Sequence, residues 1–136
     1  MKKTTGEWVR KGEADYIAAR KCRRTARSLH DVVCFHCQQC AEKYLKGVLE
    51  ELALAIPKTH DLDNLLSLLL PHHSSLRSLR RGLVFLTDFA VDTRYPGNNA
   101  SKRQAASALR WADRVRTTVR ALLGIRPRRK RRKKSP

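Results

Sequence analysis

The amino-acid sequence predicts an all-α protein, an up-and-down antiparallel bundle of four long helices and one short helix. Apolar residues recur every three or four positions along several long segments, and no segment shows a convincing strand pattern. Only 6 glycines and 5 prolines interrupt the 136 residues, which favours helices over a turn-rich β fold. The length suits one domain with a single core. We expect the bundle over residues 1–124 and a disordered basic tail over residues 125–136.

The first two helices form the longest predicted pair, from about Glu7 to Leu29 and from about Asp31 to Leu54. The apolar positions of the second follow the spacing of one helical face. The positions expected to point inward are Trp8, Ala14, Ile17, Ala18 and Cys22 in the first helix, and Val33, Cys37, Cys40, Tyr44, Val48 and Leu52 in the second.

A third, short helix is expected after the break at Pro57, with Thr59 or Asp61 as its cap. The segment 71–75 is expected to be a loop before the fourth helix. Phe85 and Phe89 lie one turn apart in that fourth helix, beside a heptad-like stripe. The inward positions are Leu62, Leu65, Leu66 and Leu69 in the third helix and Leu76, Leu79, Leu83, Leu86 and Ala90 in the fourth.

The segment TRYPGNNAS, residues 93–101, is the strongest break in the chain, since Pro-Gly and Asn-Asn both favour turns. The last helix then begins at Ser101, which forms a predicted capping box with Gln104. Gly124 ends it and Pro127 prevents a restart. Its inward positions are expected to be Ala105, Leu109, Ala112, Val115, Val119 and Leu122.

The segment VVCFHCQQC, residues 32–40, concentrates cysteine and histidine and allows three interpretations: a zinc site, a redox pair or core packing. Zinc needs four tetrahedral ligands, and His72-His73 in a loop is the only candidate second pair. A redox pair would need the strand and helix-start context that lowers a thiol pKa. Cys37 and Cys40 share a stripe with Tyr44 and Val48, so we favour core packing, because free cysteine behaves as a small hydrophobe.

The formal net charge is +18, with 30 Lys and Arg against 12 Asp and Glu. The tail, residues 126–136, holds eight bases and no acid, which leaves +10 on the rest. Such a surplus attracts polyanions such as RNA and DNA without implying sequence-specific recognition; the alternative is a solvated basic face. The tail bases expected to contact nucleic acid are Arg128, Arg129, Lys130, Arg131, Arg132, Lys133 and Lys134.

The remaining compositional features suggest where in the cell the protein is found. Residues 65–70 form an apolar run far shorter than a membrane span. No apolar segment of a signal peptide follows the first residues, and the clustered cysteines do not resemble a secreted disulfide framework. We therefore expect a cytoplasmic protein without a membrane segment.

Three motifs in register resemble the HEPN domain, named for higher eukaryotes and prokaryotes nucleotide-binding. They are FHCQQCAEKYLKGVLEE (residues 35–51), PKTHDLDNLL (57–66) and TRYPG (93–97). The resemblance spans roughly Glu7 to Gly124. Cys37 and Cys40 stand where the family usually has alanine, which supports core packing over metal.

The resemblance implies a helical bundle that typically dimerises and is often encoded beside a small nucleotidyltransferase, in a toxin–antitoxin-like arrangement. Some members are metal-independent endoribonucleases, whose signature is an Arg followed after four to six residues by His at a loop–helix junction. In that chemistry the His acts as general base or acid on the ribose 2′-OH, and the Arg stabilises charge on the phosphate.

The expected ribonuclease pair is incomplete in this chain. Arg94 is followed by Tyr95-Pro96-Gly97-Asn98-Asn99 without a histidine, and asparagine cannot transfer a proton at neutral pH. An Arg-x5-His does occur at Arg24–His30, but it is expected at the end of the first helix. The sequence therefore supports the fold better than nuclease activity.

The remaining candidate site is a set of polar residues in two loops: His60, Asp61, Arg94, Tyr95 and Asn99. Arg94 would anchor a phosphate and Tyr95 would offer a stacking face. The structural alternative has His60 or Asp61 capping the third helix, Arg94 pairing with Asp61 or Asp92, and Tyr95 filling the core. Gln39, Glu42, Lys43 and Lys46 are expected at a dimer interface or the surface, with Glu42 and Lys46 able to pair at i, i+4.

Two functions follow as hypotheses. The first is a non-catalytic HEPN module, most simply a homodimer, that binds nucleotide or RNA and pairs with a small nucleotidyltransferase. The second is a metal-independent endoribonuclease toxin that uses Arg94 with a non-standard base such as His60. The sequence contains no Gly-rich phosphate loop, paired-carboxylate motif or nucleophile elbow, and neither hypothesis requires a cofactor or a metal.

Overall fold

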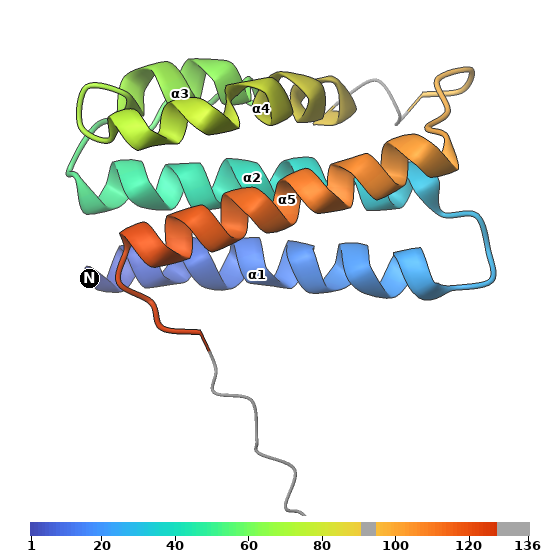
Figure 1. Cartoon of the computed structure of the whole chain (residues 1–136), viewed down its shortest axis with the longest axis horizontal. Helices are drawn as coiled ribbons and strands as arrows, with labels where there is room; N and C mark the ends of the chain where they lie inside the picture. The colour runs from blue at the N-terminus through green and yellow to red at the C-terminus, as the bar shows by residue number, and fades with distance from the viewer. Residues whose placement is uncertain (91–94, 128–136) are drawn as a thin grey trace, which may run out of the picture.

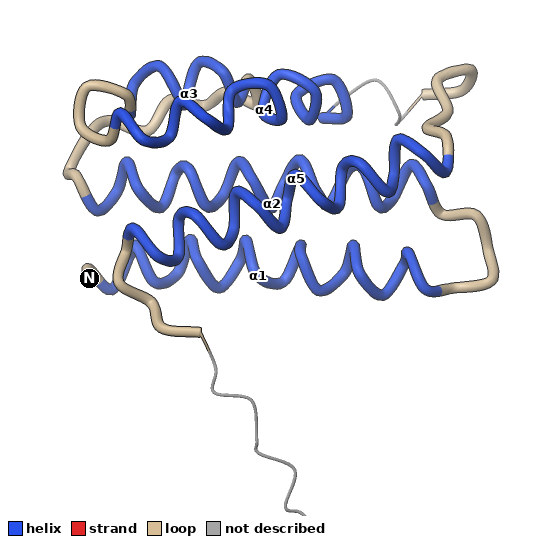
Figure 2. The backbone as a smooth tube through the Cα atoms, viewed as in Figure 1, coloured by secondary structure: helices blue, strands red, loops and turns tan. Residues whose placement is uncertain are grey.

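The computed structural model describes residues 1–90 and 95–127, and every regular element in them is helical (Figure 2). Three long helices and two short ones are present, together with two 3-10 helices. Their bounds are α1 Lys3–Arg24, α2 His30–Glu51, α3 Leu62–Leu69, η1 Ser74–Leu79, α4 Arg80–Thr87, η2 Asp88–Ala90 and α5 Lys102–Leu122. The all-α prediction is confirmed.

The helices run up and down in layers, with α2 between α1 on one side and the α3–α4 pair on the other, while α5 crosses in front of α2 (Figure 1). Helix α2 packs against each of the other four α-helices. The α1–α2 loop and the segment that leads into α5 lie at the same end of the bundle (Figure 1). This arrangement matters for the site described below.

The core stripes expected for α2, α3 and the segment 76–90 are confirmed. Val33, Cys37, Cys40, Tyr44 and Val48 are buried in α2, while Leu52 just past its end is half-buried. All four leucines expected in α3 are buried, as are the four leucines and Ala90 expected in the fourth helix. In α5 the stripe holds at four positions, but Leu109 and Leu122 are half-buried and Ala108 is buried.

The buried face of α1 differs from the predicted one. Ala14 and Ile17 are exposed, and the residues that point inward are Thr5, Gly6, Val9, Gly12, Asp15, Tyr16 and Ala19. The α1–α2 contact is close: a Cβ added at Gly12 would lie 3.0 Å from Cδ2 of Tyr44. Glycine, threonine and aspartate carry no apolar signal, so a search for hydrophobic periodicity chose the wrong face.

Two element boundaries also differ from the expectation. Helix α1 begins at Lys3 and ends at Arg24, so residues 25–29 form a loop where helix was expected. The single fourth helix expected over 76–90 is instead η1, α4 and η2 in succession. The hydroxyl of Ser78 donates to the carbonyl of Ser75 at 3.3 Å in η1, the kind of local bond with which serine competes against regular helix.

The predicted helix-end signals are present. Asp61 caps α3 by accepting hydrogen bonds from the backbone amides of Asp63 and Asn64. Ser101 and Gln104 form the predicted capping box of α5, and Gly124 adopts a left-handed φ of 74° after it. No described helix is both long enough and apolar enough to span a membrane.

Cys34, Cys37 and Cys40 are fully buried, whereas Cys22 is half-buried. Burial raises the pKa of the Cys34 thiol to about 12, and the nearby charge of Asp31 acts in the same direction. Burial likewise raises the pKa values of Cys37 and Cys40. These three thiols therefore belong to the core, as the helical spacing predicted for Cys37 and Cys40.

We expect a thiol reagent at pH 8 to modify one cysteine quickly and the other three only when the protein unfolds, because reaction requires an accessible thiolate. The change in absorbance with Ellman's reagent, with and without guanidinium, measures both phases. Replacing the half-buried residue by Cys22→Ser should remove the fast phase alone. If all four thiols react at one rate in the native protein, the burial of Cys34, Cys37 and Cys40 is contradicted.

Candidate functional site

The first sequence-predicted site residue, His60, lies against the middle of α2. Its Nδ1 lies 2.7 Å from Oε1 of Glu42, and 62% of its side chain is exposed. Glu42 is only 5% exposed and pairs with Nζ of Lys46 at 3.2 Å, as its i, i+4 spacing predicted. Gln38, fully buried, donates to Glu42 and to the backbone carbonyl of His60.

This polar network holds the α2–α3 loop against α2. A buried carboxylate needs charged or hydrogen-bonding partners, and Glu42 finds them in Lys46, Gln38 and His60. Glu42 and Lys46 are buried within the chain, so the expectation that they lie at its surface is wrong. Lys43, half-buried, instead forms an ion pair with the buried carboxylate of Asp15, which also contacts Nδ1 of His36 at 2.8 Å.

The second group of predicted residues is Arg94, Tyr95 and Asn99. Arg94 lies outside the described residues, which resume at Tyr95. Tyr95 is 59% exposed, so the alternative in which it fills the core is wrong. Its carbonyl accepts a hydrogen bond from the amide of Asn98 across a turn that contains Gly97, whose φ of 93° suits glycine. Asn99 is exposed and lines a cavity described below.

The two groups are anchored at different levels of α2. His60 meets Glu42, whereas the loop after Asn99 is fixed by the amide of Ala100, which donates to Asp31 at 2.6 Å. Glu42 and Asp31 are eleven residues apart, about 16 Å along a helix. A ligand that touches both His60 and Asn99 must span that length.

A pocket of about 210 Å³ lies at the end of the bundle, where the α1–α2 loop meets the beginning of α5. It is lined by Cys22, Arg23, Thr25, Ala26, Arg27, Ser28, Leu29, His30 and Lys102. Three of these residues are cationic, one is a histidine and none is acidic. It is more basic than two other cavities of the described chain, which are lined by residues 28–32 with 99–100 and by residues within 4–11 with Glu50.

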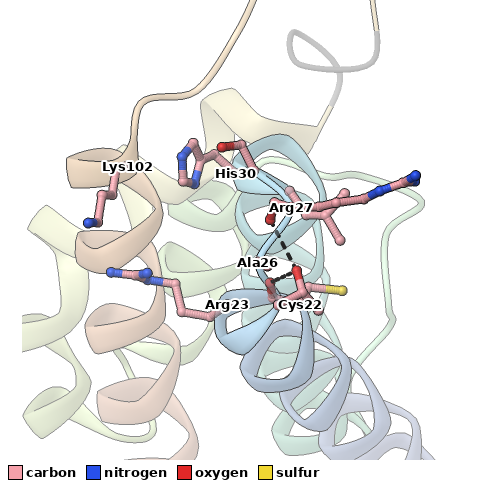
Figure 3. A pocket seen from close by; sticks show the side chains of 9 residues that line it. Cys22, Arg23, Ala26, Arg27, His30 and Lys102 are labelled. Atoms are coloured by element: carbon pink, nitrogen blue, oxygen red, sulfur yellow. Dashed lines mark hydrogen bonds between the residues drawn. The ribbon is translucent and has the colours of Figure 1, made fainter.

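The side chains of Arg23, His30 and Lys102 extend toward a common space, whereas the guanidinium of Arg27 points away from them (Figure 3). The backbone carbonyl of Arg27 accepts a hydrogen bond from the hydroxyl of Thr25, which also donates to the carbonyl of Cys22. The side chains of Arg23, His30 and Lys102 make no hydrogen bond or ion pair with another described residue. Their donors are therefore free to bind an anion.

The beginning of α2 adds to this positive potential. His30 is the first residue of this 22-residue helix, and no side chain caps its N-terminus. The first amides of a helix have no partner within it and carry the positive end of the helix dipole. An anion in the pocket would thus meet cationic side chains together with a positively polarised helix end.

A second cavity of about 330 Å³ adjoins the first and shares Ser28, Leu29 and His30 with it. Asp31, Val32, Asn99 and Ala100 line the rest of it. Of the predicted ligand residues in the described chain, Asn99 is thus the one that the fold brings to the cavity beside the basic pocket. Together the two cavities reach the size of ordinary small-ligand sites.

Sequence reasoning missed Arg23 and Lys102 and set His30 aside. Arg24, paired with His30 in the Arg-x5-His match, ends α1 and does not line the pocket. The capping box at Ser101 does predict that Lys102 begins a helix, but only the packing of α5 against α1 and α2 brings it beside Arg23. Among the described residues, no three histidines, cysteines or acids gather in a group that could hold a metal ion.

The acidic side chains are largely used by the fold. Nine of the eleven acids in the described residues accept hydrogen bonds: Glu13, Asp15, Asp31, Glu42, Glu50, Glu51, Asp61, Asp63 and Asp113. Glu13 makes the most extensive set. It accepts two hydrogen bonds from Arg116, at 2.7 and 2.9 Å, and one from the hydroxyl of Tyr44 at 2.5 Å.

The features above define a helical bundle with a basic pocket at one end, and comparison with known proteins assigns the family. The family model for the HEPN domain matches residues 5–122. The chain therefore belongs to the HEPN domain family, as its three motifs predicted. No curated protein matches it.

Two solved structures share the fold. TT1696 from Thermus thermophilus is 22% identical with a TM-score of 0.74, over 86% of this chain and 96% of that one. ST0689, an archaeal HEPN homologue, is 23% identical with a TM-score of 0.70, over 90% of this chain and 99% of that one. At these identities the likeness concerns the fold alone.

We expect Arg116→Gln to destabilise the protein by about 1–3 kcal/mol at pH 7, since it removes charged hydrogen bonds from a half-buried carboxylate. The matched variant Arg114→Gln, on the exposed side of the same helix, should change stability by less than about 0.5 kcal/mol. Urea denaturation followed by circular dichroism measures both. Equal losses of unfolding free energy in the two variants would contradict a stabilising role for the bonds between Arg116 and Glu13.

The ion pair between Glu13 and Arg116 also predicts that stability depends on pH. Burial raises the pKa of Glu13, but the hydrogen bonds from Arg116 and Tyr44 and the charges of Arg116 and Arg120 outweigh it, so that the pKa lies below its ordinary value. A lowered pKa stabilises the fold above the ordinary value and loses this contribution as the pH falls. The difference between wild type and Arg116→Gln should therefore shrink below about pH 4.

Proposed function

We propose that this HEPN protein is a non-catalytic module that binds nucleotide or RNA through phosphate at the basic pocket. The observation that carries the proposal is the convergence of Arg23, His30 and Lys102 beside the uncapped beginning of α2. Guanidinium, ammonium and helix amides are the groups with which proteins bind phosphate. Asn99 in the adjoining cavity can donate to a sugar or base.

The net charge of the whole chain supports the same partner. Since 30 bases face only 12 acids, the potential outside the bundle is positive. The tail bases from Arg128 to Lys134 lie outside the described residues and are proposed to add sequence-independent attraction to RNA. Further parts of this proposal are a homodimer in the cytoplasm and a toxin–antitoxin-like pairing with a small nucleotidyltransferase.

A second candidate function is a metal-independent endoribonuclease that uses Arg94 with His60. The geometry of His60 favours it: a buried carboxylate, Glu42, holds Nδ1, while most of the imidazole is exposed. A carboxylate that fixes one ring nitrogen leaves the other able to exchange a proton with a substrate. No described arginine forms a hydrogen bond with this histidine, so binding without cleavage remains our first proposal.

We expect Arg23→Gln and Lys102→Gln each to weaken binding of ATP by about tenfold, because a hydrogen bond between charged groups contributes about 1.5–3 kcal/mol. Isothermal titration calorimetry with ATP and with pyrophosphate measures the effect. The matched control is Arg24→Gln, which removes the same charge from the exposed neighbouring residue that does not line the pocket, and it should change affinity less than about twofold. If wild type binds neither ligand, or if the control loses as much as Arg23→Gln, the pocket is not the phosphate site.

For the second function, we expect purified protein to leave labelled RNA intact in the presence of EDTA. Cleavage by wild type that is lost in both Arg94→Ala and His60→Ala would overturn the non-catalytic proposal in favour of the ribonuclease. Because His60 also packs against Glu42, circular dichroism should first verify that each variant is folded. Gel electrophoresis of the RNA gives the result.

A further inference from the structure

Resting on the proposed function, we propose that the outer face of α5 is a nucleic-acid-binding surface that continues from the pocket. Its central side chains are Arg103, Arg110 and Arg114, which we call the α5 arginine stripe. It would bind the phosphodiester backbone of a single strand whose one end lies in the pocket. The ligand class of the site is then a polynucleotide rather than a mononucleotide.

The three arginines of the stripe lie on one face of the helix. They are seven and four residues apart, spacings that return to the same side of an α-helix, and all three are exposed. Their Cα positions rise by about 10 and about 6 Å, so the stripe is about 16 Å long. A row of this length suits a linear polyanion with regularly repeated charges.

No described acid pairs with these side chains. Arg103 makes no hydrogen bond or ion pair with another described residue, and Arg110 donates only to the hydroxyl of Ser107 on its own helix, at 3.0 Å. By contrast, Arg116 and Arg120, on a different face of α5, are bound to Glu13 and Tyr44. Helix α5 therefore divides its arginines between an internal ion-pair network and an exposed row without acidic partners.

The bases of α5 far outnumber its acids. Helix α5 contains five arginines, one lysine and a single acid, Asp113. Asp113 accepts a hydrogen bond from the hydroxyl of Tyr16 at 2.8 Å, an interaction that, after burial, helps raise the pKa of Tyr16 to about 12. A polyanion along the stripe would thus meet a strongly basic helix.

Arg114 is held in position by an aromatic ring. Its guanidinium carbon lies 5.2 Å from the centroid of the Trp111 ring. That ring packs on α4 at Gly82, where an added Cβ would lie 2.0 Å from Cε3 of Trp111. A guanidinium stacked on a fixed ring loses less freedom when it binds a phosphate, so the close contact at Gly82 preorganises this end of the stripe.

The stripe is continuous with the pocket. Lys102, which lines the pocket, is the residue before Arg103 and the first residue of α5. A strand with a phosphate at Lys102 and Arg23 can therefore proceed along α5 toward Arg110 and Arg114. Arginine forms bidentate hydrogen bonds with phosphate, and backbone contacts of this kind carry no base information, so we expect binding without sequence preference.

The test uses the full chain and a fluorescein-labelled 15-nucleotide single-stranded RNA, with fluorescence anisotropy as the readout. We expect the triple variant Arg103→Gln/Arg110→Gln/Arg114→Gln to bind the RNA at least about tenfold more weakly at 0.1 M salt. Each neutralised phosphate of a single strand contributes about 0.7 to the slope of log K against log salt. The slope should therefore fall by about 2.

The matched control is Lys58→Gln/Arg77→Gln/Arg81→Gln, which removes the same charge from exposed positions outside α5. It should reduce the salt slope by less than 1. A stripe variant that binds RNA like wild type, or a control that loses as much, would overturn the α5 surface. So would an equal loss of binding to a 15-residue polyglutamate peptide, since the stripe would then recognise negative charge and not phosphate.

The two proposals fail in distinguishable ways. The stripe variant should keep the wild-type affinity for ATP, because Arg23, His30 and Lys102 are unchanged. If it keeps both ATP and RNA affinity, the stripe is refuted and the pocket stands. If wild type binds RNA through the stripe but binds neither ATP nor pyrophosphate, the pocket proposal fails, and with it the path that joins the two surfaces. Thermal unfolding of the exposed-arginine variants should match wild type.

Discussion

The burial of α2 is the constraint on which the rest of the structure depends. This helix contacts α1, α3, α4 and α5, and 13 of its 22 residues are buried. It therefore needs small side chains where neighbouring helices approach closely, and it needs hydrogen-bonding partners for its buried polar side chains. Cys37, Cys40 and Ala41 meet the first demand. Gln38, Glu42 and Lys46 meet the second, because they hydrogen-bond one another and the loop at His60. The segment that looked like a metal site is thus the packing surface of the bundle.

The need to pair buried polar groups also divides the basic residues into two sets, those that pair with acids in the interior and those that do not. Burying or half-burying acids such as Glu13, Asp15 and Glu42 requires cationic partners, and the helices supply one set of bases for that purpose. The bases left over at the pocket and along α5 form no ion pair with a described acid. The protein has a net charge of +18. Its buried acids are nevertheless paired, and its unpaired bases give the surface a positive potential. That separation underlies both proposals for phosphate binding.

The success of sequence reasoning varied with the kind of signal. Where apolar residues were dense, as in α2 and α3, periodicity placed the buried face correctly. It failed in α1, whose inward face contains Thr5, Gly12 and Asp15, because close backbone packing and ion pairing leave no hydrophobic pattern. Capping signals at Asp61, Ser101 and Gly124 were accurate, since they depend on a few neighbouring residues. Of the candidate site, Asn99 was anticipated, whereas Arg23 and Lys102 were missed.

By itself the sequence determined the helical class, the family, the helix ends marked by caps at Asp61, Ser101 and Gly124, and the burial of Cys37 and Cys40, because each depends on local spacing or on residues close in the chain. Only the tertiary structure decided which side chains share a site. It anchored His60 at Glu42, about 16 Å along α2 from the level of Asn99, and it joined Arg23, His30 and Lys102 from three helices. The reason is geometric: the distance between residues far apart in sequence is set by how the helices pack, which no single segment encodes.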